Sequence, residues 1–298
     1  RGTELAKKDP GLFKKALALK ELSDLIVGIV GGRHTHPTTP TIGGFHKLPS
    51  KKKLKEILKK LENTESDTLE TVELVEALNF PKLQVDFKLI AQIEDSVVLV
   101  DSKEFDNKQE FLVKNYKKNI QEEVRDYSTA KFGKYQNQEL FAGALARLAI
   151  YPNYNNNYEV NYLKKHHLNL DFANPFHNNI AQAVECLYYH QKAQEIINDL
   201  INMNLEKEIA EPSGDCSGEG VGVTEAPRGG LYHEVTLDGN LKILEANIIT
   251  PTVQNLTSIE KSAKEIIVQN PKTSNDELEK LIVMLVRAYD PCITCSVH

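Results

Sequence analysis

The chain has 298 residues, of which 41% are hydrophobic, and it carries a formal net charge of −6 at pH 7. This length can bury a substantial core as one large domain or two smaller ones, and the mild acidity argues against a general nucleic-acid surface. No apolar run reaches the roughly 20 residues that a membrane-spanning helix needs. Four cysteines fit a reducing compartment better than a disulfide scaffold, so we expect a cytoplasmic protein without a secretion signal or a direct membrane span.

The first part of the chain is predicted to be mainly helical. Residues 3–30 have the apolar spacing of a long helix, which ends at the Gly31-Gly32 pair. A loop rich in Pro and Gly follows as far as Gly44. Beyond it, the pattern predicts helices at 51–62 and 68–79, a small β insert at about 85–101, and helices at 110–125, 138–150, 155–168 and 178–204.

The last part of the chain combines a β-hairpin with two helices. A Gly-rich stretch at 213–222 precedes a hairpin at about 230–246, which turns through Asp-Gly-Asn at 238–240. A helix pair at 253–269 and 275–289 then leads to Pro291, which stops the second helix. The pattern predicts a mainly α fold, in which a helical core carries small β inserts within one domain over 1–298.

The residues with the strongest chemical signal are the last nine of the sequence. Cys292 and Cys295 lie three positions apart, directly after the last predicted helix, with Asp290 before them and His298 after them. One helical turn brings both sulfurs to the same side, so that the pair can close on one metal ion. A four-sulfur site would need two more ligands from elsewhere. The segment 290–298 is therefore predicted to bind metal.

Three other interpretations of the cysteine pair stay open. A redox dithiol usually opens a helix after a strand, whereas this pair follows a helix. The pair could also consist of inert buried thiols. A zinc knuckle needs a second Cys or His pair, and Cys186 and Cys216 each stand alone. A soft-metal site completed from elsewhere is the favoured interpretation.

The segment 224–233 is the second candidate for chemistry, because it combines Glu225, Pro227, Arg228 and two glycines. Glycines let the backbone approach a ligand closely, and Pro227 can rigidify the turn that aims Arg228. The guanidinium fork suits an anion or a polarised diatomic ligand. The alternative is a tight turn with a surface arginine.

Three further motifs have simple structural alternatives. The segment 248–255 places a proline and hydroxyls after a strand, and Thr252 could be an ordinary helix N-cap. The loop 31–37 is either an anion-binding loop or, more simply, structural punctuation. Surface or core positions are expected for His166, His167 and His177.

Taken together, four stretches in this order resemble the catalytic large subunit of nickel–iron hydrogenases. They are the Gly-Gly-Arg-x-x-His-Pro loop at 31–37, the Glu-Ala-Pro-Arg-Gly turn at 225–229, the Pro-Thr at 251–252 and the Asp-Pro-Cys-x-x-Cys-x-x-His ending at 290–298. The turn's wording and the Ile-Gly-Gly-Phe at 42–45 are most similar to the soluble, cofactor-coupled cytoplasmic branch. The resemblance implies a large-subunit-like fold without its N-terminal part, and reversible heterolytic cleavage of H2.

The resemblance implies a role for each matching residue of the metal site. Cys292 would be a terminal nickel thiolate, and Cys295 would bridge nickel and an iron that carries carbon monoxide and cyanide. Arg228 would overhang the metals, with Asp290 holding it in place. Soft thiolates suit nickel and low-spin iron, and a terminal thiolate or a pendant arginine could serve as the base in H2 cleavage.

The resemblance also implies a pocket, a second ion and partner subunits. His298 and the backbone carbonyl of Ile248 would bind magnesium or a similar divalent ion. An iron–sulfur small subunit would carry electrons, together with nicotinamide- or deazaflavin-linked subunits. The pocket for the diatomic ligands would be lined by Pro227, Leu231, Thr250, Pro251 and Thr252.

The sequence departs from the family pattern in what it lacks. The first cysteine pair, in an Arg-x-Cys-Gly-x-Cys context, is absent, as are the glutamate expected to relay protons and the acid expected to complete the magnesium site. A split large subunit with a second chain carrying the other pair is the favoured explanation, and an incomplete chain is the second. The third is a degenerate relative that serves as a metal-free scaffold or assembly subunit, as in complex I-like assemblies. A zinc-binding interaction module is a weaker alternative.

Overall fold

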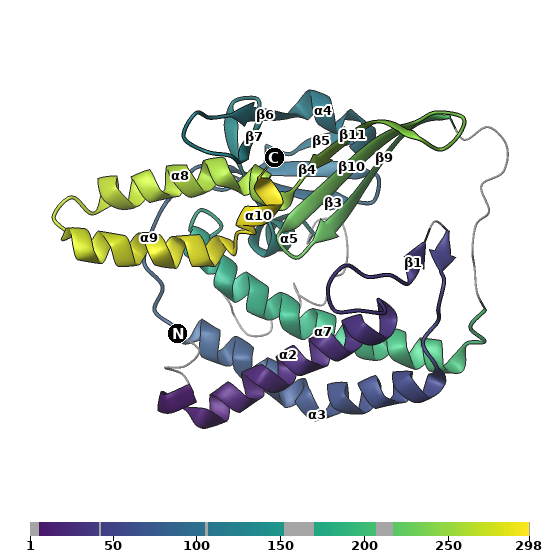
Figure 1. The fold of residues 1–298 in the computed structure, drawn as a ribbon. Helices are drawn as coiled ribbons and strands as arrows, with labels where there is room; N and C mark the ends of the chain where they lie inside the picture. Colours follow the sequence, from purple (N-terminus) through teal and green to yellow (C-terminus); the bar gives the residue numbers. More distant parts are fainter. Residues whose placement is uncertain (1–5, 42, 105–106, 152–169, 207–216, 298) are drawn as a thin grey trace. The chain divides into compact units, whose positions relative to one another are not determined.

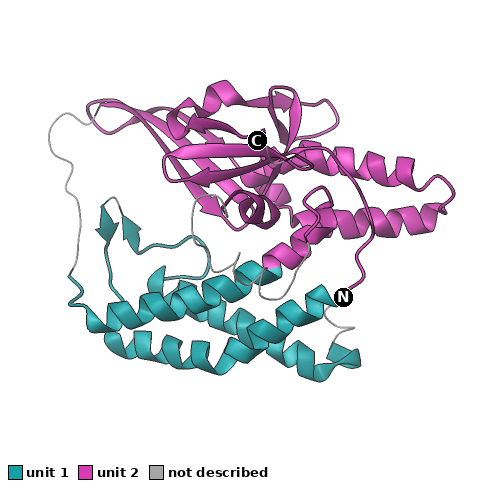
Figure 2. Ribbon diagram, turned by 180° about the vertical axis from the view of Figure 1, so that it is seen from behind, with its two compact units in different colours: residues 1–77, 183–214 teal, residues 78–182, 215–298 magenta. Residues whose placement is uncertain are grey.

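The computed structural model describes residues 6–41, 43–104, 107–151, 170–206 and 217–297. The chain forms two compact units, which Figure 2 colours separately. Unit 1 comprises residues 1–77 and 183–214, and unit 2 comprises residues 78–182 and 215–298.

Unit 1 is built from helices. It contains α2 (Pro10–Val30), α3 (Lys51–Glu76), most of α7 (Asn178–Asn202) and the two-residue strands β1 (Pro40–Thr41) and β2 (Gly44–Phe45). Asp9 caps α2 by accepting a hydrogen bond from the N–H of Leu12, and Gly31 ends the helix. The core of the unit is formed by Leu22, Leu54, Ile57, Leu61 and Ile197.

The predictions for unit 1 are partly right. The helix expected at 178–204 is confirmed, but the separate helices at 51–62 and 68–79 are wrong, because α3 is continuous. Its buried stripe runs on through Thr64 and Thr68, whose hydroxyls donate to carbonyls one turn back, at 2.9 Å from the oxygen of Lys60 and 2.7 Å from that of Glu65. The polar stretch therefore continues the helix instead of ending it.

Unit 2 contains two sheets. The six-stranded sheet has the order β5-β4-β3-β8-β7-β6, in which β3 and β8 are parallel and the other neighbours antiparallel. Its strands are β3 (Lys88–Ile93), β4 (Ser96–Asp101), β5 (Gln109–Leu112), β6 (Ile120–Val124), β7 (Lys131–Tyr135) and β8 (Gln138–Ala142). The antiparallel second sheet has the order β11-β10-β9, with β9 (Gly218–Ala226), β10 (Gly229–Leu237) and β11 (Ile243–Ile249).

Helices pack on these sheets and complete the core of unit 2. They are α4 (Tyr116–Asn119), α5 (Ala144–Ile150), α8 (Pro251–Gln269), α9 (Asn275–Tyr289) and α10 (Ile293–Ser296), with short 3-10 turns at Val113–Asn115 and Pro175–His177. Figure 1 shows α8 and α9 side by side, with α10 at the end of the pair. In the main cluster Phe141 stacks on Phe87 at 4.9 Å between ring centroids and contacts Tyr289 at 4.8 Å.

The predictions for unit 2 are partly right. The insert at 85–101, the hairpin at 230–246 and the helix pair at 253–269 and 275–289 are all confirmed as elements. The helix at 110–125 is wrong, because this segment holds β5, two short helical turns and β6, which pair with β4 and β7. Strand pairing overrides the helix-like apolar spacing there. Of the helix predicted at 138–150, the second part is confirmed as α5, whereas residues 138–142 form strand β8.

The helix expected at 155–168 lies outside the described residues. Within the parts of the chain that the structure describes, no helix is long and apolar enough to cross a membrane.

Candidate metal centre

The C-terminal segment turns sharply where α9 ends. Asp290, which follows Tyr289, adopts the left-handed conformation (φ 48°, ψ 52°), and its N–H donates to the carbonyl of Arg287 at 3.1 Å. Aspartate tolerates this region better than most residues. Tyr289 anchors the turn, because its ring is buried and its hydroxyl lies 3.0 Å from that of Ser262. The buried Tyr289 therefore fixes the position at which the chain turns towards the cysteines.

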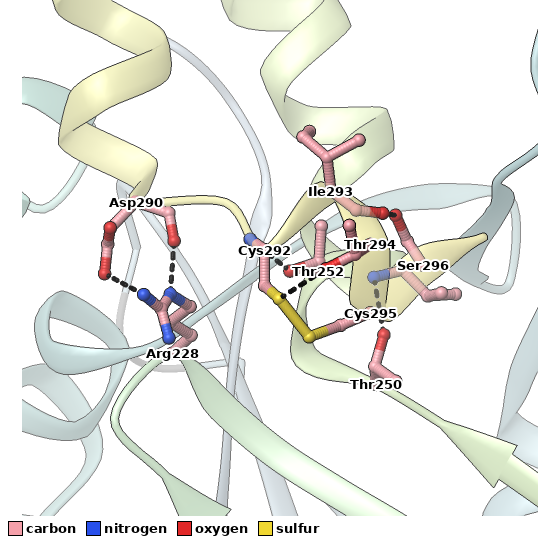
Figure 3. The surroundings of a disulfide bond; sticks show 10 residues. Arg228, Thr250, Thr252, Asp290, Cys292, Ile293, Thr294, Cys295 and Ser296 are labelled. Atoms are coloured by element: carbon pink, nitrogen blue, oxygen red, sulfur yellow. Dashed lines mark hydrogen bonds and ion pairs between the residues drawn. A yellow bond between two sulfur atoms is a disulfide. The ribbon is translucent and has the colours of Figure 1, made fainter. Parts of the chain in front are cut away.

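Both cysteines lie on one short helical turn, as Figure 3 shows. Their Cα atoms are 5.3 Å apart, and the sulfurs are joined as a disulfide. The N–H of Cys292 donates to the hydroxyl oxygen of Thr252 at 3.0 Å, and the N–H of Cys295 donates to the carbonyl of Cys292 at 3.0 Å. The N-terminus of α8 thus holds the first cysteine, and the turn itself holds the second.

Arg228 reaches the same segment from the turn between β9 and β10. Its Nη2 atom lies 2.8 Å from Oδ2 of Asp290, and its Nε atom donates to the backbone carbonyl of Asp290 (Figure 3). Nη1 takes part in neither bond. Both side chains keep solvent exposure, 38% for Arg228 and 53% for Asp290. The double contact fixes the plane of the guanidinium beside the cysteine turn.

Two buried side-chain amides of α8 hold strands β8 and β10 next to the β9–β10 turn. The side chain of Asn255 accepts from the N–H of Ala142 at 2.7 Å and donates to the carbonyl of the same residue at 3.1 Å. Its Nδ2 atom also lies 3.5 Å from the carbonyl oxygen of Arg228. Gln254 donates to the carbonyl of Gly230 at 2.6 Å. These contacts were not predicted, and the only signal for them in the sequence is the pair of adjacent amides at the start of the predicted helix.

The five expected pocket residues lie at two places in the site. Thr250, Pro251 and Thr252 are buried at the start of α8, whereas Leu231 is half-buried and Pro227 is exposed. The N-cap of α8 is Thr250, which accepts from the N–H of Val253 at 3.4 Å, so the alternative of Thr252 as the cap is wrong. Thr252 uses its oxygen as an acceptor for Cys292 and keeps its hydroxyl proton for donation.

The remaining motifs have separate positions. Ile248 lies on β11 opposite His233 and is 42% exposed, while His298 is outside the described residues. The loop 31–37 belongs to unit 1, where the N–H of Thr38 donates to the carbonyl of Gly31 at 2.8 Å.

The isolated histidines and cysteines give no second ligand cluster among the described residues. His177 accepts from the N–H of Asp171 at 2.9 Å, and burial lowers the pKa of its imidazole. Cys186 is a free, exposed thiol. His166, His167 and Cys216 lie outside the described residues.

The donor set of the terminal segment fits half of a thiolate metal site. Two soft sulfurs on one turn suit nickel or iron once the disulfide is reduced, because thiolates are the ligating form. Within the described ranges, no group of three or more His, Cys, Asp or Glu residues could hold a metal ion by itself.

Comparison with solved structures identifies the architecture. The structure of an NAD+-reducing nickel–iron hydrogenase in the H2-reduced state matches with a TM-score of 0.84 at 20% identity, over 99% of this chain and 71% of that chain. A nickel–iron–selenium hydrogenase from Dm. baculatum matches with a TM-score of 0.73 at 19% identity, over 96% of this chain and 68% of the other. The fold is that of nickel–iron hydrogenase large subunits, as predicted.

Sequence comparison gives the family. A family model described as nickel-dependent hydrogenase matches residues 82–298. The alpha subunit of sulfhydrogenase 1 from Pyrococcus furiosus is 32% identical over 311 residues, covering 95% of this chain and 67% of that protein. One subunit of the F420-non-reducing hydrogenase of Methanothermobacter thermautotrophicus is 27% identical over 339 residues, covering 99% and 67%. The chain belongs to the nickel-dependent hydrogenase family and spans about two thirds of these relatives.

Proposed function

We propose that this chain is the C-terminal part of a nickel–iron hydrogenase large subunit that cleaves H2 reversibly and heterolytically. The observation that carries the proposal is the convergence of five residues in unit 2. Arg228 is bonded twice to Asp290, and two residues further on Cys292 is bonded to Thr252 and shares one turn with Cys295. Family membership supports the reaction class, and this convergence supports the choice of residues.

We assign each of these residues a role that its contacts support. Cys292 and Cys295 provide two thiolates. A nickel–iron centre with carbon monoxide and cyanide on the iron supplies Lewis acidity and the redox step when bound. Arg228 presents a guanidinium beside the thiolates, where Nη1 can hold a proton in the site, and Asp290 keeps it there. Thr252 keeps a hydroxyl proton for a polar ligand, and Thr250 and Pro251 exclude water.

Two thiolates are missing, and we propose that a segment outside these 298 residues supplies them. That segment belongs either to a second chain, as in a split subunit, or to another part of the same protein. Cys295 is exposed, and the neighbouring Ile293 and Val297 are 58% and 46% exposed, respectively. A segment that completes the site would cover this apolar surface and exclude water from the reaction.

We extend the proposal to partners and to a second ion. Electrons would pass to an iron–sulfur small subunit in a cytoplasmic complex. A nicotinamide-linked subunit is favoured over a deazaflavin-linked one, because one relative of this chain is the beta subunit of the NAD-reducing hydrogenase HoxS. His298 and the carbonyl of Ile248 would bind a magnesium-type ion.

The test is anaerobic purification of the chain with the subunits that accompany it, followed by metal analysis and infrared spectroscopy. Stoichiometric nickel and iron, with carbonyl and cyanide bands, are expected. Cys295→Ser and Cys292→Ser should abolish the centre, whereas Cys186→Ser, a control at a free exposed thiol, should retain it. Stoichiometric zinc alone, or no metal in matured material, would replace the proposal with an interaction module or a metal-free scaffold.

A second variant tests the proposed role of Arg228. Arg228→Lys should leave the nickel and iron content largely intact, because the side chain is not a metal ligand. It should lower the H2-oxidation rate about 100-fold or more, since a point ammonium cannot reproduce the fork that Asp290 holds. Unchanged activity would exclude the pendant role.

A further inference from the structure

A second arginine lies inside unit 2. Helix α5 is apolar apart from Arg147, all seven of its residues are buried, and the side chain of Arg147 is 2% exposed. Taking a guanidinium out of water costs several kcal/mol unless its donors are satisfied. We therefore expect the guanidinium of this buried arginine to be hydrogen-bonded to several acceptors.

The acceptors are consecutive residues of the turn that carries Arg228. Nη1 of Arg147 lies 2.8 Å from Oε2 of Glu225 and donates to the carbonyl of Ala226 at 3.0 Å. Nη2 donates to the carbonyl of Pro227 at 2.8 Å. One planar fork thus spans the three residues that precede Arg228, an arrangement that the single ammonium of lysine cannot match.

The same turn is held from two other directions. The N–H of Gln92 on β3 donates to Oε1 of Glu225 at 2.7 Å, so both carboxylate oxygens of that residue are used. At Gly143 (φ 121°), directly before α5, a Cβ atom would lie 3.3 Å from the carbonyl oxygen of Arg228. Backbone therefore packs on backbone beneath Arg228, and Arg147 adds the polar connection.

We propose that Arg147 is a positioning residue, which fixes the turn at 225–227 so that the guanidinium of Arg228 meets Asp290 beside the cysteines. This inference rests on the function proposed above for Arg228. Arg147 itself is separated from the cysteine segment by the turn that it holds. Its effect is therefore indirect, through the backbone from which Arg228 projects.

The first test needs no metal and no activity. In the full chain labelled with ¹⁵N-arginine, the Nε–H of Arg228, bonded to the carbonyl of Asp290, should give a signal protected from solvent exchange. Arg228→Lys assigns that signal by its loss. Arg147→Lys should remove its protection, whereas Leu148→Ala, a change at the neighbouring buried position of the same helix, should keep it.

The second test is a double-mutant cycle on the assembled enzyme. Arg147→Lys should lower kcat about 100-fold with an unchanged KM for H2, because a small misplacement of a catalytic group costs about that factor. In an Arg228→Lys background it should cost little more, since the group that it positions is gone. Leu148→Ala should cost the same factor in both backgrounds.

The outcomes separate the two proposals. Unchanged Nε–H protection in Arg147→Lys, or an equal loss of kcat in both backgrounds, would overturn the positioning role. If Arg147→Lys does not fold, Glu225→Gln, which removes the carboxylate charge but keeps the side chain's shape, takes its place with the same expectations. An inactive, metal-free wild-type complex would refute the proposed function while leaving the exchange result valid.

Discussion

The amide of Asn255 can be tested for its contribution to the stability of unit 2. The side chain is 2% exposed and satisfies both the N–H and the carbonyl of Ala142, at 2.7 and 3.1 Å. Asn255→Leu keeps the size of the side chain but leaves two buried backbone groups without a partner. Each unsatisfied group costs about 1–3 kcal/mol, so the free energy of unfolding should fall by roughly 2–6 kcal/mol.

Urea denaturation followed by far-UV circular dichroism measures this loss, and it suits a chain without tryptophan. Asn119→Leu is the matched control, because among the described residues its amide donates to the carbonyl of Asn115, the residue directly before α4, at 2.9 Å. That change should cost about 1 kcal/mol or less. A loss in Asn255→Leu no larger than that of the control would refute the reasoning.

Three further variants test other contacts. Asp290→Asn should change the free energy of unfolding by less than about 1 kcal/mol, since the ion pair with Arg228 is half-exposed. The same variant should clearly lower the H2-oxidation rate, and an unchanged rate would contradict the proposed role of Asp290. Gly229→Ala should give little soluble protein, because φ at this position is 128° and the new Cβ atom would lie 2.4 Å from that of Ala142. The control Gly220→Ala, whose new Cβ atom has no neighbour within 4 Å, should express normally. Burial raises the pKa of Glu234, but hydrogen bonds from Lys117 and Tyr116 outweigh burial and hold that pKa below the usual 4.5. The wild type should therefore have a larger free energy of unfolding than Glu234→Gln above pH 4.5, and this difference should vanish as the pH falls through the lowered pKa. A difference in urea midpoints that does not change with pH would contradict this.

The sequence predicts those parts of the fold in which local signals and tertiary packing agree. The pair α8 and α9 was predicted within two residues, because caps and an apolar stripe mark each helix. The segment 110–125 was not, since its apolar residues also suit helical spacing, and only its pairing with β4 and β7 decides for strands. Pairing between strands that are distant in the chain produces no local pattern from which a single sequence could predict it.

The same contrast holds for the site. The cysteines, Arg228 and Asp290 could be named from their motifs, and the structure brings Arg228 and Asp290 together. Arg147 could not be named, because a lone arginine in an apolar helix does not reveal which carbonyls it will meet. Its partners Glu225 and Pro227 lie 78 and 80 residues further along the chain, and only the tertiary fold brings them to it.

The site separates residues available for chemistry from residues that hold them. Arg228 and Asp290 lie at a turn and a helix end and keep solvent exposure, whereas Arg147, Asn255 and Thr252 are each 2% exposed. Turn residues have few contacts of their own, so their geometry depends on buried polar groups that reach them from neighbouring elements. Direct hydrogen bonds and an ion pair join these residues to one another, so the positions of Arg228 and of the cysteine turn depend on the packing of unit 2 around them.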